Sequence, residues 1–250
     1  MFRDGVLWGL STMSRSNDVI IARLCSVALC NLSCKYWKDI ATSNSIKAVY
    51  YFSRSDDEAV MGAGVKTLHN VLLRAQHLDG VEHIFASAVP LAGRALEHIS
   101  KDVRLVGLRL THLISTTTTS RETAIQHGLM KRVDVKDFVS DEPLCHSFCC
   151  ALERFALDPA TRRSVLDSGC IISFPALGAV SPRILECLTR FLYIVSCSPE
   201  HVAALVLEHD CVKVAAAVVD QRCADGTGSP DGTRDMCAAL LFNLSTQARY

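Results

Sequence analysis

A short phrase that recurs along the chain constrains its fold more than any other sequence feature. It first appears as LCNLS at residues 29–33. Five related phrases follow, and aligning all six defines one anchor residue in each: Asn31, Asn70, His112, Arg154, Arg190 and Asn243. Because self-similarity at a fixed period is the signature of a repeat array, the chain is predicted to be a repeat protein.

Apolar residues surround each anchor at helical spacing. Leu lies two residues before every anchor, an apolar residue lies one after it, and an apolar residue or Gly lies six before it. These offsets share one face of an α-helix, whereas residues on one face of a strand are two apart. The pattern therefore predicts one amphipathic anchor helix in each repeat.

A second landmark precedes each anchor helix, at intervals of 39 to 42 residues. It is a residue suited to a tight or left-handed turn, except at Ala86. The other landmarks are Gly5, Asn44, Gly128, Gly169 and Asp210. The repeats are expected at about 1–33, 34–75, 76–117, 118–157, 158–197 and 198–250, in one solenoid that belongs to a longer chain.

Local signals predict the helices of the first two repeats. Residues 5–14 read as a helix, and Asn17 or Asp18 is expected to cap the anchor helix at 19–33. The first repeat is predicted to lack its first helix. In the second repeat, helices are expected at 36–43 and 46–52, and a third follows the acidic turn 56–58. Gly62 and Gly64 inside that third helix predict close helix contact.

Proline and glycine give the expected element boundaries in the later repeats. Pro90 is placed near the start of a second helix, and residues 116–120 read as a polar connector. Helices are expected at 122–127 and 129–139. Pro143 and Pro182 each predict the first turn of a third helix, and residues 223–233 read as a flexible loop by composition.

Composition and charge exclude several classes of protein. Hydrophobic residues make up 49% of the chain, but no uninterrupted apolar run approaches the ~18 residues that a membrane span requires, so no transmembrane helix or membrane insertion is expected. Asp4 and a short apolar patch make the start a poor secretory signal. With 26 basic and 26 acidic side chains there is no net-charge argument for binding nucleic acid.

Twelve cysteines raise the question of a metal or disulfide framework. Cys25 and Cys237 lie six residues before their anchors, where a free cysteine packs as a small apolar residue. The tightest cluster is Cys145, His146, Cys149 and Cys150. A zinc site is the alternative for this cluster, but tetrahedral sites need four ligands, so core packing without a metal is predicted. A reducing compartment, the cytoplasm with the nucleus or cilium as alternatives, is expected.

The phrase ALCNLS at residues 28–33 resembles the end of an armadillo repeat, in which a short helix and a Gly turn lead into two longer helices. HEAT repeats are the close rival, but they lack the separate first helix. The resemblance covers about 245 residues and implies an all-α, right-handed α-solenoid of about six repeats, whose third helices line a concave groove.

In armadillo proteins such as importin-α and β-catenin, the groove holds extended peptides and the anchor Asn bonds the peptide backbone. By position, Asn31, Asn70 and Asn243 match that Asn, whereas His112, Arg154 and Arg190 do not. Importin-α also has a Trp four residues earlier, and this chain has none there. A nuclear-import adaptor is therefore the less favoured function.

Helix geometry places residues four apart along the predicted groove, and cations dominate there. They are Arg23, Lys35, Lys66, Arg74, Arg104, Arg154 and Arg190, against Glu186, Asp158 and Asp235. Arg suits paired hydrogen bonds with carboxylate or phosphate, so an acidic or phosphorylated peptide is the predicted partner. The alternative is that these cations are merely solvated.

No Gly-rich phosphate loop, HExxH or GxSxG pattern occurs, so no enzyme, catalytic residue or cofactor is predicted. The main prediction is a protein-binding scaffold. The alternative is a structural segment packed laterally in a ciliary, cytoskeletal or junctional assembly, because both ends of the array lack polar caps and are expected to support self-association or a larger assembly.

Overall fold

The computed structural model describes residues 2–78, 80–169, 174, 177, 181–198, 200–201, 205, 216 and 232–247. Helices and no strands are found in this part of the chain. The chain divides into two compact units, residues 1–132 (unit 1) and 133–250 (unit 2), and each is described by itself.

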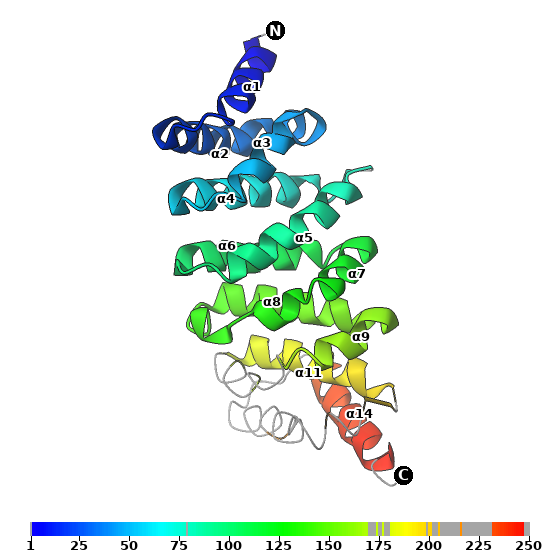
Figure 1. The fold of residues 1–250 in the computed structure, drawn as a ribbon. Coiled ribbons are helices and arrows are strands. Elements are labelled where there is room, and N and C mark those ends of the chain that lie inside the picture. The colour runs from blue at the N-terminus through cyan, green and yellow to red at the C-terminus, as the bar shows by residue number, and fades with distance from the viewer. Residues whose placement is uncertain are drawn as a thin grey trace. The chain divides into compact units, whose positions relative to one another are not determined.

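Unit 1 is a stack of helices in chain order (Figure 1). Third helix α4 packs against α2 on one side and α6 on the other, and the shorter helices cover one flank. The elements are α1 (Phe2–Met13), α2 (Val19–Thr42), α3 (Ser45–Phe52), α4 (Glu58–Ala75), α5 (Glu82–Leu96), α6 (Lys101–Ile114), α7 (Thr118–Gln126) and the 3₁₀ turn η1 (Leu129–Arg132).

Unit 2 follows the same plan, with α11 packed between α8 and α14. Its described elements are the 3₁₀ turn η2 (Val135–Asp137), α8 (Glu142–Leu157), α9 (Pro159–Leu166), α11 (Pro182–Ser196) and α14 (Gly232–Gln247). Most of the predicted loop at 223–233 lies outside the described residues, and α14 begins within its last residues.

Side-chain caps start the third helices α2, α4, α8 and α11 where the sequence predicts them, whereas Ser100 at the start of α6 makes no such bond. Asp18 accepts hydrogen bonds from the N–H groups of Ile20 and Ile21 at the start of α2. Asp57, Asp141 and Ser181 do the same for α4, α8 and α11. Each cap bonds N–H groups that have no partner inside the helix, so these boundaries follow from local chemistry.

The core consists of apolar rows shared between neighbouring repeats. Leu68 of α4 and Leu110 of α6 are fully buried, and these two helices pack against each other. In unit 2, Phe191 of α11 meets Phe174 edge to face, with ring centroids 5.4 Å apart. One helical repeat cannot hide such a face alone, which is why neighbouring repeats stack.

The turn landmarks are confirmed in part. Gly128 and Gly169 have φ angles of +62° and +74°, the left-handed geometry expected of them. Gly5, in contrast, lies inside α1, and Asn44 has a right-handed φ of −63° at the start of α3. Asp210 lies outside the described residues. The first helix of the second repeat, predicted at 36–43, forms the last part of α2, and a kink at Tyr36 separates it from the anchor helix.

The third repeat departs from its prediction because Ala86 does not turn. The chain turns earlier, at Gly80 with φ +79°, and α5 then runs unbroken through residues 82–96. Pro90 is therefore in the middle of a helix and not near its start. It removes one backbone hydrogen bond, but it lies on the exposed side, where the freed carbonyl can be solvated.

Two boundaries of the fourth repeat were also wrong. Helix α7 begins at Thr118, capped by Thr117, so most of the expected polar connector is helical. The predicted helix at 129–139 is instead two 3₁₀ turns. The Asp134 carboxylate accepts the N–H of Lys136, a local bond that starts a new turn and competes with a continuous helix.

The two glycines of α4 have different roles. A Cβ built on Gly64 would lie 2.5 Å from the Ser53 backbone nitrogen and 2.7 Å from the Phe52 carbonyl carbon. The predicted close contact is therefore confirmed at Gly64. It is wrong for Gly62, whose Cβ would make an ordinary contact of 3.6 Å with Val103.

We expect Gly64→Ala to lower the free energy of unfolding by about 1–3 kcal/mol, because backbone must move to admit the methyl group. Gly62→Ala is the matched control in the same helix. It should be neutral or stabilising by up to about 1 kcal/mol, since Ala favours helix over Gly. Urea denaturation followed by circular dichroism measures both, and equal effects would contradict the close-contact interpretation.

Candidate functional site

Serine hydroxyls define equivalent positions on the third helices more sharply than the anchor alignment does. In four of these helices the hydroxyl donates to the carbonyl oxygen three residues earlier, at 2.6 to 2.9 Å. The serines are Ser33, Ser115, Ser196 and Ser245. Two of them lie two residues after Asn31 and Asn243. Counting back two residues from Ser115 and Ser196 gives Leu113 and Ile194 as the equivalent anchor positions, in place of His112 and Arg190.

Packing supports this corrected register. Gly107 of α6, like Gly64 of α4, lies so close to the preceding helix that its Cβ would be 3.0 Å from the Leu96 nitrogen. When α4 and α6 are aligned on these two glycines, Lys66 is equivalent to Arg109 and His69 is equivalent to His112. In α11, Leu192 and Val195 repeat the spacing of Leu188 and Phe191 one turn later, so apolar spacing alone does not distinguish the two registers.

The anchor asparagines bond to the preceding third helix in both units. Asn70 Nδ2 donates to Ser33 Oγ at 2.9 Å, and Asn243 Nδ2 donates to Ser196 Oγ at 3.1 Å. Asn31 is exposed. Each amide nitrogen also approaches a cysteine sulfur, Cys34 Sγ at 3.7 Å from Asn70 and Cys197 Sγ at 4.0 Å from Asn243. The amides of Asn70 and Asn243 are thus oriented from within the fold.

The third-helix surface of unit 1 carries four basic side chains that we call the basic patch: Lys66, His69, Arg109 and His112. Lys66 and Arg109 are exposed, and the two histidines are half-buried. No carboxylate of the described residues forms a salt bridge with Lys66 or Arg109. Sequence reasoning missed His69 and Arg109, which the corrected register would have found.

The electrostatics of the patch are visible at His69. Burial lowers the pKa of His69 below its ordinary value, a hydrogen bond with Asn70 opposes this, and the neighbouring Arg109, His112 and Lys66 lower it further. Cations therefore surround the ring closely enough to repel its protonated form. Such a surface favours a ligand that brings negative charge.

Two of the predicted groove cations are held by the protein itself. Arg23 forms a two-pronged ion pair with Asp57, with Nη2 to Oδ2 at 2.7 Å, and this bond lowers the pKa of the Asp57 carboxyl group. Arg104 donates to the carbonyl oxygens of His98 and Ile99 at 2.8 and 2.7 Å, just beyond the end of α5. Both stabilise helix connections.

Of the other predicted cations in unit 1, Arg74 is exposed in the last turn of α4, and Lys35 Nζ lies 5.6 Å from the centre of the Tyr36 ring. In unit 2, Arg190 is paired with Glu186 at 3.2 Å and with Glu153 at 3.5 Å. Arg154 is half-buried in the last turn of α8. Positive charge at Arg190 is therefore compensated within unit 2.

A cleft of about 620 Å³ lies between α1 and α3, and none of its lining residues was predicted as a site. Trp8, Tyr51, Lys47 and Arg54 are among them. These residues belong to the flanking helices and their connections, and not to the third helices.

Helix α2 is long and apolar enough to cross a membrane by length and composition, contrary to the expectation that no such segment exists. A mostly buried core helix passes the same test, and 22% of this apolar window is buried. The hydrogen bond from Asn70 to Ser33 and the ion pair of Arg23 with Asp57 attach α2 to α4 and its cap.

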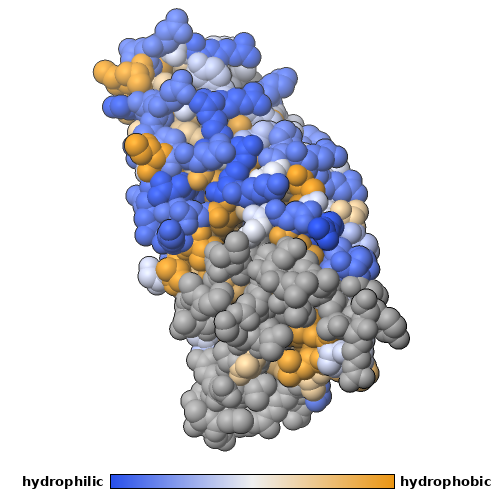
Figure 2. All heavy atoms as spheres, turned by 60° about the horizontal axis from the view of Figure 1, so that its bottom comes forward, coloured by the Kyte–Doolittle hydropathy of each residue, from blue (hydrophilic) through white to orange (hydrophobic). Residues whose placement is uncertain are grey.

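One face of the molecule is mainly polar where it is described. On the face shown in Figure 2, hydrophilic residues cover most of the coloured area and hydrophobic residues gather in small groups.

Comparisons with known proteins identify the fold. No family model and no curated protein matches the sequence. Solved structures do match, and three are designed armadillo repeat proteins at 11% identity that cover 94% of this chain and 98% of theirs. Their TM-scores are 0.72, 0.70 and 0.73; the second is in complex with the peptide (KR)4, and the third was designed for modular peptide recognition. The chain has an armadillo-like repeat fold.

Proposed function

We propose that the chain is a non-catalytic protein-binding scaffold, and that the third helices of unit 1 take an extended acidic segment of a partner protein. The observation that carries this proposal is the uncompensated charge of Lys66 and Arg109, at equivalent positions on neighbouring third helices. An exposed Arg with a free guanidinium suits paired hydrogen bonds to a carboxylate or phosphate group.

The repeat geometry favours an extended ligand. Neighbouring third helices offer the same positions in succession, so a peptide that crosses them meets one set of side chains per repeat. Asn70 is held in place by Ser33, and its amide oxygen has two lone pairs, so it can accept a further hydrogen bond from a peptide N–H. Asn31 is exposed and offers an amide at the equivalent position of α2.

The designed proteins support peptide binding as a use of this fold, and one of them is in complex with a basic peptide. Charge complementarity selects between binding partners of opposite sign. The basic patch of this chain therefore favours a peptide of the opposite charge. Of the cations predicted from the sequence, Lys66 is now the best candidate for contact with the peptide, in place of Arg154 and Arg190. Arg109, His69 and His112 join it in the basic patch.

Reversing the patch tests the proposal. We expect the double variant Lys66→Glu and Arg109→Glu to weaken binding of a fluorescent oligoglutamate peptide by at least about tenfold, or roughly 1.4 kcal/mol, because two attractions become repulsions. Fluorescence anisotropy at low salt measures the affinity, which should fall as ionic strength rises.

The matched control is Lys47→Glu with Arg54→Glu, which makes the same change in net charge on the cleft between α1 and α3. This control should retain most of the wild-type affinity. An equal loss in both double variants, or no binding by the wild type, would show that the patch is not an acidic-peptide site.

Asn70 and Asn31 separate structural from binding roles. Asn70→Ala should lower the free energy of unfolding by about 0.5–1.5 kcal/mol, because the amide donates to Ser33. Asn31→Ala should change it by less than about 0.5 kcal/mol, since the side chain is exposed. Both variants should weaken peptide binding. If only Asn70→Ala loses affinity, the loss follows from lower stability, and the asparagines do not bond the peptide backbone.

A structural role in a larger assembly is the second candidate, and exposed apolar residues favour it. Ile20, Leu24 and Val27 lie on one face of α2, exposed by 64%, 67% and 50%, and Trp8 of α1 is 71% exposed. Surfaces of this kind mark protein contacts. We propose that a ciliary, cytoskeletal or junctional neighbour, or a second copy of the chain, covers this face in a cytoplasmic setting.

Sedimentation velocity over a range of concentrations checks this alternative. We expect the wild-type chain to self-associate, and Ile20→Lys with Leu24→Lys to remain monomeric, since charge on that face opposes its burial. Lys47→Glu with Arg54→Glu again serves as control and should associate like the wild type. A wild-type monomer at all concentrations would exclude self-association through this face.

A further inference from the structure

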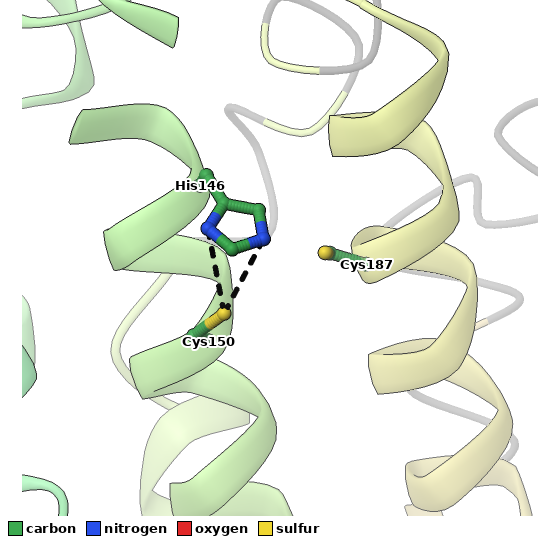
Figure 3. Close-up of side chains that lie close together, drawn as sticks. All are labelled: His146, Cys150 and Cys187. Carbon is green, nitrogen blue, oxygen red and sulfur yellow. Dashed lines mark hydrogen bonds between the residues drawn. The ribbon is translucent and has the colours of Figure 1, made fainter. Parts of the chain in front are cut away.

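Three side chains that can bind a metal converge in unit 2 (Figure 3). His146 and Cys150 come from α8, and Cys187 points toward them from α11. One ligand atom from each lies within 4.8 Å of the others, and Cys150 Sγ is 3.8 Å from both ring nitrogens of His146. Cys187 is buried and the other two are half-buried, so the cluster is partly shielded but reachable.

The sequence places these residues together through helix geometry. His146 and Cys150 are four residues apart and therefore share one face of α8. Cys187 comes from the next third helix, which packs against α8. Cys145 and Cys149, the other two members of the cysteine and histidine cluster singled out in the sequence, do not belong to this group. Both are buried, and the Cys145 thiol donates to the Phe138 carbonyl oxygen at 3.3 Å.

We propose that His146, Cys150 and Cys187 form a zinc site. Two thiolates and one imidazole are ligands that zinc accepts, and three protein ligands leave a fourth tetrahedral position for water or a partner side chain. With Zn–S near 2.3 Å and Zn–N near 2.0 Å, ligand atoms on one tetrahedral ion lie roughly 3.5–3.8 Å apart. The sulfur-to-nitrogen distance already meets this value.

Small side-chain rotations complete the geometry. The Cys150 sulfur is equally far from the two ring nitrogens, so the His146 ring has to turn about its Cβ–Cγ bond to direct one nitrogen at the ion. The carboxylates of Glu142 and Glu153 act on His146 electrostatically, while Glu142 accepts a hydrogen bond from Ser181 and Glu153 pairs with Arg190.

The two thiols share one proton more readily than they lose both. Their mutual hydrogen bond lowers the pKa of Cys150 and raises that of Cys187, and burial also raises the pKa of Cys187. The Cys187 proton therefore leaves only when an ion takes its place. Zinc binding replaces the two thiol protons, which pass to the solvent, and the imidazole binds as the neutral form, so the occupied site carries no net charge.

Metal titration of the full 250-residue chain, reduced and stripped of metal, tests the site. We expect about one zinc ion per chain in competition with a chromophoric chelator, and a tetrahedral thiolate spectrum with Co²⁺. Zinc should also raise the Tm, because it joins α8 to α11. Cys187→Ser and His146→Ala should each abolish the Co²⁺ spectrum and the zinc-dependent Tm shift.

Cys34→Ser and Cys197→Ser are the matched controls, since both cysteines are exposed and lie outside the cluster. They should bind zinc like the wild type, and circular dichroism confirms that all variants fold. Zinc stoichiometry unchanged in Cys187→Ser, or no zinc bound by the wild type, overturns the proposal. A Cys150–Cys187 disulfide that persists under the reducing conditions of the titration, detected by mass spectrometry, overturns it as well.

Discussion

The close approach of neighbouring helices at glycine is the contact on which the rest of the structure depends. At Gly64 the third helix lies so near the preceding helix that a methyl group has no room, and at Gly107 a methyl group would be 3.0 Å from Ala95 and Leu96, so these neighbours would have to shift. This approach fixes which side of α4 and of α6 faces inward. The apolar rows then bury against the next repeat, and the opposite face is left for polar residues.

A fixed inward face determines what gathers on the free one. Residues at the same offset on neighbouring third helices come to lie side by side, whatever their chemistry. Lys66 and Arg109 hold equivalent positions in unit 1 and both act on the charge of His69. Residues at nearby offsets also meet: Asn70 bonds Ser33, which lies two residues beyond the equivalent Asn31. In unit 2 the packing of α11 on α8 brings Cys187 to His146 and Cys150. The candidate sites are consequences of register and not of a shared sequence motif.

The register of the third helices could be predicted only in part from the sequence. The repeat period, the all-helical fold and the capped starts of α2, α4, α8 and α11 could be predicted, because period and caps are local signals. The position of a helix face is less certain, since apolar residues recur on every turn. His112 was displaced by one residue and Arg190 by one turn. The serine that follows Leu113 and Ile194 by two residues was the signal that separates these registers.

Chain-level neutrality conceals different chemistry on the two units. Arg190 in unit 2 is balanced by Glu153 and Glu186, whereas among the described residues no carboxylate forms a salt bridge with Lys66 or Arg109 in unit 1. Equal totals of acidic and basic residues therefore exclude a field of one sign over the whole molecule, but not a local one. Because a Debye length is only about 8 Å at physiological salt, an extended peptide responds to the charges it touches and not to the sum over the chain.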